Sequence, residues 1–338
     1  MKNDLVQPAL YAKIAELLQS ARQAVVRVVN QTMVYTYYEI GRMIVEEEQE
    51  GKERAAYGQQ VLEEVSVQLT QNFGKGFSIV NLRQMRAFYL SYSIQQKSSA
   101  ELQRPHFQLS WSHYLKLMRM ENWEERSFYE IEAAANNWTL KELQRQFDAA
   151  LYERLALSRD KEGIRQLAEK GQIIEKPTDL LKDPYILDFL DLPDQHRYSE
   201  SDLEQALINK LEHFLLELGK GFTFVGRQVR FTFNERHYKV DLVFFNRLLR
   251  CFVVIDLKLG DLTHQDLGQI QMYVNYYDRF VRLPDESKTV GIVLCKDKND
   301  TLVEITLPEN NDSIFASRYK TILPDKQLLV NLLNQSEI

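Results

Sequence analysis

Residues 237–258 read HYKVDLVFFNRLLRCFVVIDLK and form two apolar runs around a polar turn. The runs, 237–245 and 251–257, are rich in Val, Phe and Ile, which favour β-strands. Asp241 and Asp256 lie at equal distances from the middle of the turn. An antiparallel hairpin folded there would set the two carboxylates opposite each other. This stretch therefore predicts a pair of strands that carries two acids to one place.

The second run ends in Asp256, Leu257 and Lys258, a D-x-K pattern. Because strand side chains alternate between faces, Asp256 and Lys258 project the same way and Leu257 is buried behind them. Two carboxylates and a lysine are what hydrolysis of a phosphodiester requires, since carboxylate oxygens hold Mg²⁺ and a lysine helps to position a water. The alternative for these residues alone is an ion pair between Asp256 and Lys258 beside a solvated Asp241.

The segments on either side of this hairpin predict an α/β core with a mixed sheet. Ser201 and Glu204 have the spacing of a capping box, which predicts a helix from there to about Leu218. The other expected elements are strands over 222–225 and 228–233, a helix over about 263–281 and a strand over about 289–294.

The N-terminal half predicts helices throughout 9–152, because apolar residues recur there at helical spacing. A helix over about 57–72, a glycine-rich turn and a helix from Ser78 to about Tyr92 have the proportions of a helix-turn-helix over 57–92. Its side chains suited to phosphates and base edges are Lys75, Asn81, Arg83, Gln84 and Arg86. The alternative is an ordinary helical hairpin with a solvated basic face.

The length of 338 residues favours two domains over one. Prolines among short apolar pieces mark a connector over 158–198. We expect it to separate a helical domain, 1–157, from an α/β domain, 199–338. The predicted fold class is therefore α+β, with an all-helical N-terminal domain followed by an α/β domain.

The net charge of −6 argues at first against a nucleic-acid partner, but the distribution of charge matters more than its sum. No acidic residue lies between Glu64 and Glu101, and basic residues outnumber acidic ones from Gly219 to Lys258. A globally acidic protein can thus present two locally basic surfaces.

The cysteines and the apolar segments indicate a cytoplasmic protein. Cys251 and Cys295 each lie in an apolar run, with neither a CxxC motif nor a zinc-binding pattern, as expected for reduced, buried thiols. The N-terminus lacks the pattern of a secretory signal, and no uncharged apolar segment is long enough to span a membrane.

Motifs spread along the chain carry a family resemblance. Val240-Asp241 followed by the D-L-K of 256–258 resembles the PD-(D/E)xK nuclease superfamily. Gln269 and Tyr273 match the Q-x-x-x-Y helix motif of several of its branches, and Glu204 matches the acidic residue that often precedes its core strands.

More closely, the chain resembles the YhcG-like family of bacterial proteins from about Val34 to Leu329. The segments that carry this resemblance in the C-terminal half are FTFVGRQ, YKVDLVFFNRLLRCFVVIDLKLGDL, GQIQMYVNYYD and VGIVLCKDKND. Those in the N-terminal half are YGQQVLEEVSVQL, FGKGFSIVNLRQMRAFY and LSWSHY. The resemblance is specific as a set and implies a restriction-endonuclease-like fold for the C-terminal domain.

By position, the resemblance implies that Asp241 and Asp256 bind a metal ion, with Glu204 as a third ligand, and that Lys258 is the catalytic lysine. Glu204 can alternatively be explained as the acid of the capping box. The implied ion is Mg²⁺, for which Mn²⁺ can substitute. Val240 stands where the superfamily has Pro, and Asp256 where the family more often has Glu. Neither departure removes a needed functional group.

Gln269 and Tyr273 are implied to line the site, with Gln269 touching the acids, the lysine or the nucleic-acid backbone. Arg227 and Gln228, near the core strands, are candidates for contacts with phosphate. The implied function is a Mg²⁺-dependent endonuclease, with DNA favoured as substrate. The alternative is a nucleic-acid-binding or scaffolding protein that keeps the fold without turnover, and a homodimer is an open option for its assembly.

Overall fold

A computed structural model describes residues 8–50, 55–98, 107–157, 159, 161–190, 192 and 198–335. The chain divides into two compact units, Met1–Leu140 and Lys141–Ile338. No helix among the described residues is both long and apolar enough to cross a lipid bilayer.

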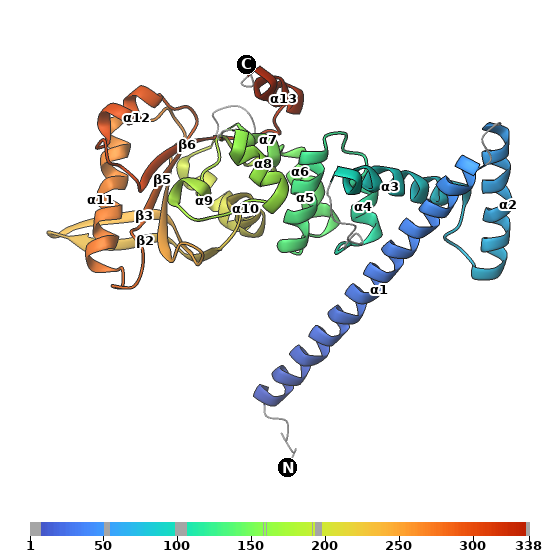
Figure 1. Ribbon diagram of the computed structural model, residues 1–338. Helices are drawn as coiled ribbons and strands as arrows, with labels where there is room; N and C mark the ends of the chain where they lie inside the picture. Colours follow the sequence, from blue (N-terminus) through green and yellow to red (C-terminus); the bar gives the residue numbers. More distant parts are fainter. Residues whose placement is uncertain are drawn as a thin grey trace, which may run out of the picture. The chain divides into compact units, whose positions relative to one another are not determined.

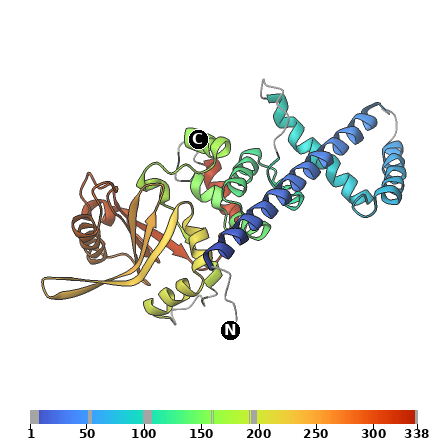
Figure 2. The same ribbon diagram turned by 90° about the horizontal axis from the view of Figure 1, so that it is seen from below.

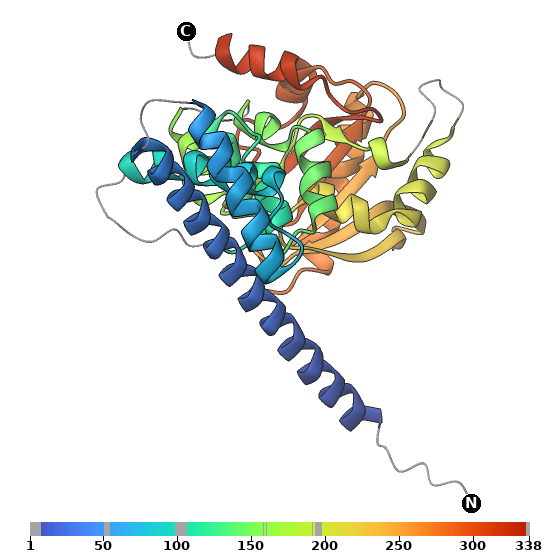
Figure 3. The ribbon, with the colours of Figure 1, turned by 90° about the vertical axis from the view of Figure 1, so that its right-hand side faces the viewer.

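The first unit is built from helices in its described part. They are α1 (Pro8–Glu50), α2 (Ala55–Phe73), α3 (Ile79–Ser98), α4 (Trp111–Leu117) and α5 (Trp123–Ala135). The first half of α1 is largely exposed, and Figure 3 shows it as one long straight helix. An aromatic core forms around the buried ring of Phe88, which packs against Tyr92, Phe107 and Tyr114.

Close packing of α1 on α3 depends on Gly41, where an added Cβ would collide with the carbonyl group of Met85. The turn between α2 and α3 contains Gly74 and Gly76, both with positive φ, a conformation that a side chain disfavours. Leu82 and Met85 on α3 are buried. The helical N-terminal half is therefore confirmed.

The second unit contains a mixed sheet with helices around it (Figure 1). Its helices are α6 (Leu140–Asp148, beginning at the boundary), α7 (Leu151–Ala156), α8 (Lys161–Lys170), α9 (Glu200–Asn209), α10 (Leu211–Leu218), α11 (His264–Phe280), α12 (Asp300–Thr306) and α13 (Lys326–Gln335). Its strands are β1 (Tyr185–Ile186), β2 (Phe222–Phe233), β3 (Arg236–Asn246), β4 (Cys251–Leu257), β5 (Val290–Cys295) and β6 (Ile314–Lys320).

The sheet has the order β1-β6-β5-β4-β3-β2. β1, β6, β5 and β4 run parallel, while β3 is antiparallel to both β4 and β2. Parallel strands must be covered on both faces, which explains why β5 is buried along its whole length. The β2–β3 hairpin extends beyond the rest of the sheet (Figure 2). The predicted α/β core with a mixed sheet is confirmed.

Two apolar clusters hold helices to opposite faces of this sheet. α9 and α10 contribute Leu203, Leu207 and Phe214 to one cluster, and α11 contributes Leu267, Ile270, Tyr273, Val274 and Tyr277 to the other. Alternation along β4 places Val254 in the α11 cluster and Ile255 in the α9–α10 cluster. Asp256 therefore projects on the same face as α11.

The local structure differs from the sequence prediction at three helix and strand boundaries. The expected helix 201–218 is two helices, which meet at Lys210. The expected strands 222–225 and 228–233 are one strand with a register shift between Phe224 and Gly226. In the predicted connector, residues 185–186 form β1 of the sheet, whereas residues 158, 160, 191 and 193–197 lie outside the described part.

A buried ion cluster around Glu217 joins α6, α7 and β1 to α10. The carboxylate of Glu217 is fully buried, lies 2.7 Å from Nη1 of Arg154, and accepts a hydrogen bond of 2.9 Å from the backbone N–H of Ile186. Arg145 lies 3.4 Å from the same carboxylate, and the Lys182 ammonium donates to the Glu217 carbonyl oxygen. Burial alone would raise the pKa of Glu217, but these cations lower it to about 2.

We expect Glu217→Gln to lower the free energy of unfolding by about 3–5 kcal/mol, because it leaves the Arg154 guanidinium buried without its counter-ion. The folded pKa is depressed below the ordinary value of 4.5, so the carboxylate's contribution is complete above that pH and is lost as the pH falls toward about 2. Urea unfolding at several pH values should show that the difference in free energy of unfolding between wild type and variant disappears as the pH falls through this range.

The matched control is Glu169→Gln, which removes a carboxylate from an exposed ion pair with Arg165. It should leave the free energy of unfolding at the wild-type value at every pH. If the difference in free energy of unfolding between wild type and Glu217→Gln stays constant from neutral pH to about pH 2, the assigned pairing is contradicted.

Candidate active site

The register of β3 against β4 brings Asp241 and Asp256 together. Leu242 pairs with Ile255, so the two acids are the next opposing pair along the ladder. The backbone N–H of Leu257 donates to Oδ2 of Asp241 at 2.8 Å, which ties the first acid to the strand of the second. The carboxylates thus meet at one point of the sheet, as the symmetry of the hairpin predicts.

Asp256 is the most deeply buried group of the site, with an exposed fraction of 1%. The Lys258 ammonium lies 3.0 Å from its Oδ2, but outside hydrogen-bonding geometry, and this oxygen has no hydrogen bond among the described residues. Burial and the negative charge of Asp241 raise the pKa of Asp256 to about 7. A cation beside the two acids would stabilise the ionised form.

Lys258 follows β4 and points back over the acids. Its ammonium lies 3.0 Å from Asp256 and 3.8 Å from Asp266, whose carboxylate also caps the first turn of α11. Burial works to lower the pKa of Lys258, but the charge of Asp256 outweighs it, and the net pKa is raised. The lysine therefore stays protonated at neutral pH and can donate hydrogen bonds.

Gln228 on β2 links the acids to α9. Its amide donates to Oε2 of Glu204 and, at 3.1 Å, to Oδ1 of Asp241. It does so from a left-handed backbone conformation with φ of 47°, which costs energy for a residue other than glycine. The Gln228 amide is thus shared by two carboxylates, and its contact with phosphate stays a prediction.

Glu204 faces this site and does not cap its own helix. The capping box of α9 is formed by Ser199 and Asp202, so the predicted box of Ser201 with Glu204 is wrong. Glu204 is buried, and burial raises the pKa of its carboxyl. The alternative that Glu204 caps the start of α9 is therefore excluded.

α11 supplies the wall over the acids. Nε2 of Gln269 donates to the hydroxyl oxygen of Tyr273 at 2.5 Å, and the Tyr273 side chain is buried. Burial and the charges of Asp256 and Asp241 raise the pKa of this phenol, which places it in the electric field of the acids. Gln269 reaches the tyrosine and, in the described part of the chain, forms no hydrogen bond with the acids or the lysine.

The donors at this site suit a hard cation. Among the described residues, no three His, Cys, Asp or Glu side chains converge to enclose a metal by themselves. Mg²⁺ seldom needs such a cage, because one or two carboxylates hold it while water and phosphate oxygens complete its shell. The unbonded oxygen of Asp256 beside Asp241 fits that mode of binding.

The remaining predicted contact residues have other surroundings. Arg227 donates to the side-chain oxygen of Gln205 at 2.6 Å and is exposed. In the first unit, Arg86 forms an ion pair with Glu48 at 2.6 Å, and Asn81 donates to the carbonyl oxygen of Gly76. Lys75 and Arg83 are exposed, and Gln84 is half-buried.

Sequence reasoning missed the contribution of Asp266 and the bridging role of Gln228. The capping box that Asp266 forms with Thr263 follows a recognisable spacing, which could have placed an acid near Lys258. No pattern in the sequence marks the bridge made by Gln228, because it depends on three separate elements.

Comparison with known proteins covers both halves of the chain. Residues 178–334 match the model of the YhcG PDDEXK nuclease domain, and residues 13–154 match the DUF1016 N-terminal domain. The protein described as "Putative nuclease YhcG" of Escherichia coli (strain K12) is 41% identical over 349 aligned positions, covering 96% of this chain and 92% of that protein.

A repair endonuclease from Pyrococcus abyssi is a weak structural neighbour, with a TM-score of 0.26 and 16% identity. The match covers 37% of this chain and 49% of that one.

The geometry at Gln228 makes a prediction about stability. Gln228→Ala removes the donor shared by two carboxylates, and we expect it to lower the free energy of unfolding by about 1 kcal/mol or more. Gln228→Gly removes the same amide but tolerates the positive φ, which costs other residues about 1–2 kcal/mol. Chemical denaturation should therefore rank the glycine variant above the alanine variant. The reverse order would show that the backbone at this position relaxes freely.

Proposed function

Because the chain belongs to the YhcG family, we propose that it is a metal-dependent endonuclease that hydrolyses phosphodiester bonds, with DNA as its substrate. The observation that carries the proposal is the meeting of Asp241 and Asp256 under the ammonium of Lys258, with one buried Asp256 oxygen left without a hydrogen bond. An ordinary strand-end ion pair would not need the second carboxylate.

Asp241 and Asp256 would hold the divalent ion, and Glu204 is close enough to Asp241 to share one amide donor with it. When bound, a divalent ion neutralises charge that develops on the phosphate and makes a bound water more acidic. The residues of the chain fix the acids for this purpose: the N–H of Leu257 and the amide of Gln228 hold the Asp241 carboxylate in one orientation.

Lys258 would orient the attacking water or stabilise a phosphate oxygen through its N–H donors. Its proximity to Asp256 keeps it protonated, so it acts as a donor and an electrostatic partner. Tyr273, held by Gln269, closes the side of the site that α11 covers and limits the access of bulk water to the acids.

The first unit supplies a separate candidate contact with nucleic acid. Lys75 in the turn before α3 and Arg83 on α3 are exposed and lie in the acid-free stretch of the sequence. We propose that they bind phosphates, whereas Arg86 is occupied by Glu48 and serves the packing of α1 on α3.

We expect Lys258→Ala to reduce cleavage of DNA by about 100-fold or more, while DNA affinity stays within about 3-fold of the wild-type value. The variant removes a donor to the reacting groups and leaves the rest of the surface intact. Single-turnover cleavage with Mg²⁺ and a binding titration with a chelator measure the two quantities separately. Lys288→Ala, at an exposed ion pair with Asp312, is the control and should cleave normally. If Lys258→Ala cleaves DNA at the wild-type rate, Lys258 serves only its ion pair with Asp256.

Thermal unfolding provides a test that does not depend on activity. With Mg²⁺ or Mn²⁺ at about ten times its Kd, the stabilisation is about 1.4 kcal/mol, or about 3–5 °C for a domain of this size. We expect a chelator to abolish this shift, and Asp241→Asn and Asp256→Asn to lack it. Asp285→Asn, which alters an exposed carboxylate, should retain it. An equal shift in all three variants would place ion binding elsewhere.

A further inference from the structure

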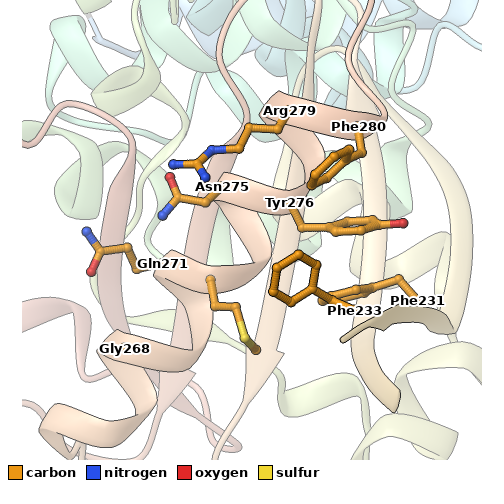
Figure 4. A pocket seen from close by; sticks show the side chains of 9 residues that line it. Phe231, Phe233, Gly268, Gln271, Asn275, Tyr276, Arg279 and Phe280 are labelled. Atoms are coloured by element: carbon orange, nitrogen blue, oxygen red, sulfur yellow. The ribbon is translucent and has the colours of Figure 1, made fainter. Parts of the chain in front are cut away.

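A cavity lies between the end of β2 and α11. Its volume is about 310 Å³, the size of a small-ligand pocket. Figure 4 shows the rings of Phe231, Phe233, Tyr276 and Phe280 on one side and the polar ends of α11 side chains on the other. The mechanism above uses none of these residues.

The aromatic side of the cavity is already ordered for stacking. The rings of Phe231 and Tyr276 stack with centroids 4.0 Å apart and planes 19° apart, and Phe280 lies 5.3 Å from Tyr276. Phe233 and Phe280 are 56% and 63% exposed. Exposed rings gathered at a cavity indicate a surface that a ligand covers, and flat aromatic faces suit another flat ring.

The polar side presents the donors and acceptors of three side chains from α11. Gln271, Asn275 and Arg279 follow one another at four-residue intervals along α11, so they share one face of the helix. Within the described residues, none of them has a hydrogen bond or an ion pair. Amides can donate to and accept from the edge of a base, and a guanidinium binds phosphate.

Ring contacts lead from the cavity to the tyrosine beside the acids. Phe231 contacts Tyr276 in the cavity and meets Tyr273 edge-on, with centroids 5.7 Å apart. Tyr273 in turn lies in the electric field of Asp256 and Asp241. On the hairpin, Arg236 pairs with Phe233, so its side chain leaves from the same face and adds positive charge at the edge.

We propose that this cavity binds an unpaired nucleobase of the nucleic-acid strand whose backbone passes the active site. The inference rests on the proposed function and deepens it by naming the substrate class. The base stacks on the exposed rings, its edge meets Gln271 and Asn275, and Arg279 binds an adjacent phosphate. Stacking on aromatic side chains is tolerant of sequence and requires a base that is free of its own stack. The substrate is therefore a strand with a single-stranded segment near the scissile bond.

Gly268 allows the cavity to be filled without disturbing the fold. It is a helical residue that lines the cavity, and an added Cβ would meet no atom within 4 Å. Gly268→Leu therefore blocks the space, and Phe280→Ala removes one exposed ring. Thr301→Leu adds the same leucine on the exposed surface of α12 and is the matched control.

The probe is a fluorescent single-stranded DNA of about 15 nucleotides, titrated beside the fully paired duplex of the same sequence in the presence of a chelator. We expect Gly268→Leu and Phe280→Ala each to weaken single-strand binding by about 5- to 100-fold and to leave duplex binding within about 2-fold. Thr301→Leu should bind both like the wild type. Unchanged single-strand binding by Gly268→Leu would overturn the proposal, as would equal losses for strand and duplex.

Two further measurements separate this inference from the proposed function. Binding is measured without a metal ion, so a wild type that binds the strand but never cleaves it would refute the nuclease and keep the cavity. Cleavage of a substrate with a single-stranded segment is the other comparison. If the wild type and the cavity variants cleave it equally well, the base-binding role of the cavity is refuted and the nuclease function stands. Light scattering tests whether a second copy of the chain occupies the cavity. If Gly268→Leu changes the molar mass in solution, the cavity is a contact between copies of the chain, and the proposal fails.

Discussion

The register of β3 against β4 is the constraint on which the active site depends. It forces Asp241 and Asp256 to be neighbours where the sheet is covered by α11, and water screens their repulsion poorly there. The raised pKa of Asp256 is the direct consequence. The Leu257 N–H, the Gln228 amide and the Lys258 ammonium offset part of the repulsion, yet one oxygen of Asp256 stays without a hydrogen bond. A cation beside the two acids would offset this residual deficit of positive charge.

The hairpin and its acids could be predicted from the sequence, because strand alternation and turn symmetry are local properties. The start of α9 shows where local reasoning fails. Ser199–Asp202 and Ser201–Glu204 have the same spacing two residues apart, so propensity cannot choose between them. Burial decides: the helix begins at Glu200, and Glu204 then faces the sheet. Because the cap lies two residues earlier than predicted, Glu204 is not the capping acid and instead shares the Gln228 amide with Asp241.

Other features depend on contacts between distant parts of the chain and leave no periodic signal. Glu217 reads as a helical surface residue, but it is fully buried because Arg154 and Ile186 reach it from α7 and β1. The short β1 lies in what the prolines predict as a connector, and its pairing with β6 joins residues far apart in the sequence. The rings of the aromatic cavity likewise come from β2 and α11, and only the fold brings them together.

The two sites are linked through the packing of α11. Gly291 on β5 lets the helix approach the sheet, since an added Cβ would lie 2.7 Å from Val274 and 2.8 Å from Ile270. Gly291 pairs with Val254, two residues before Asp256, so the close approach occurs next to the acids. The same helix carries Tyr273, which is buried, and Tyr276, which lines the cavity. Because interiors are closely packed, a shift of α11 would move both walls together. In the proposed complex, the packing of α11 on Gly291 would therefore set the distance between the stacked base and the scissile phosphate.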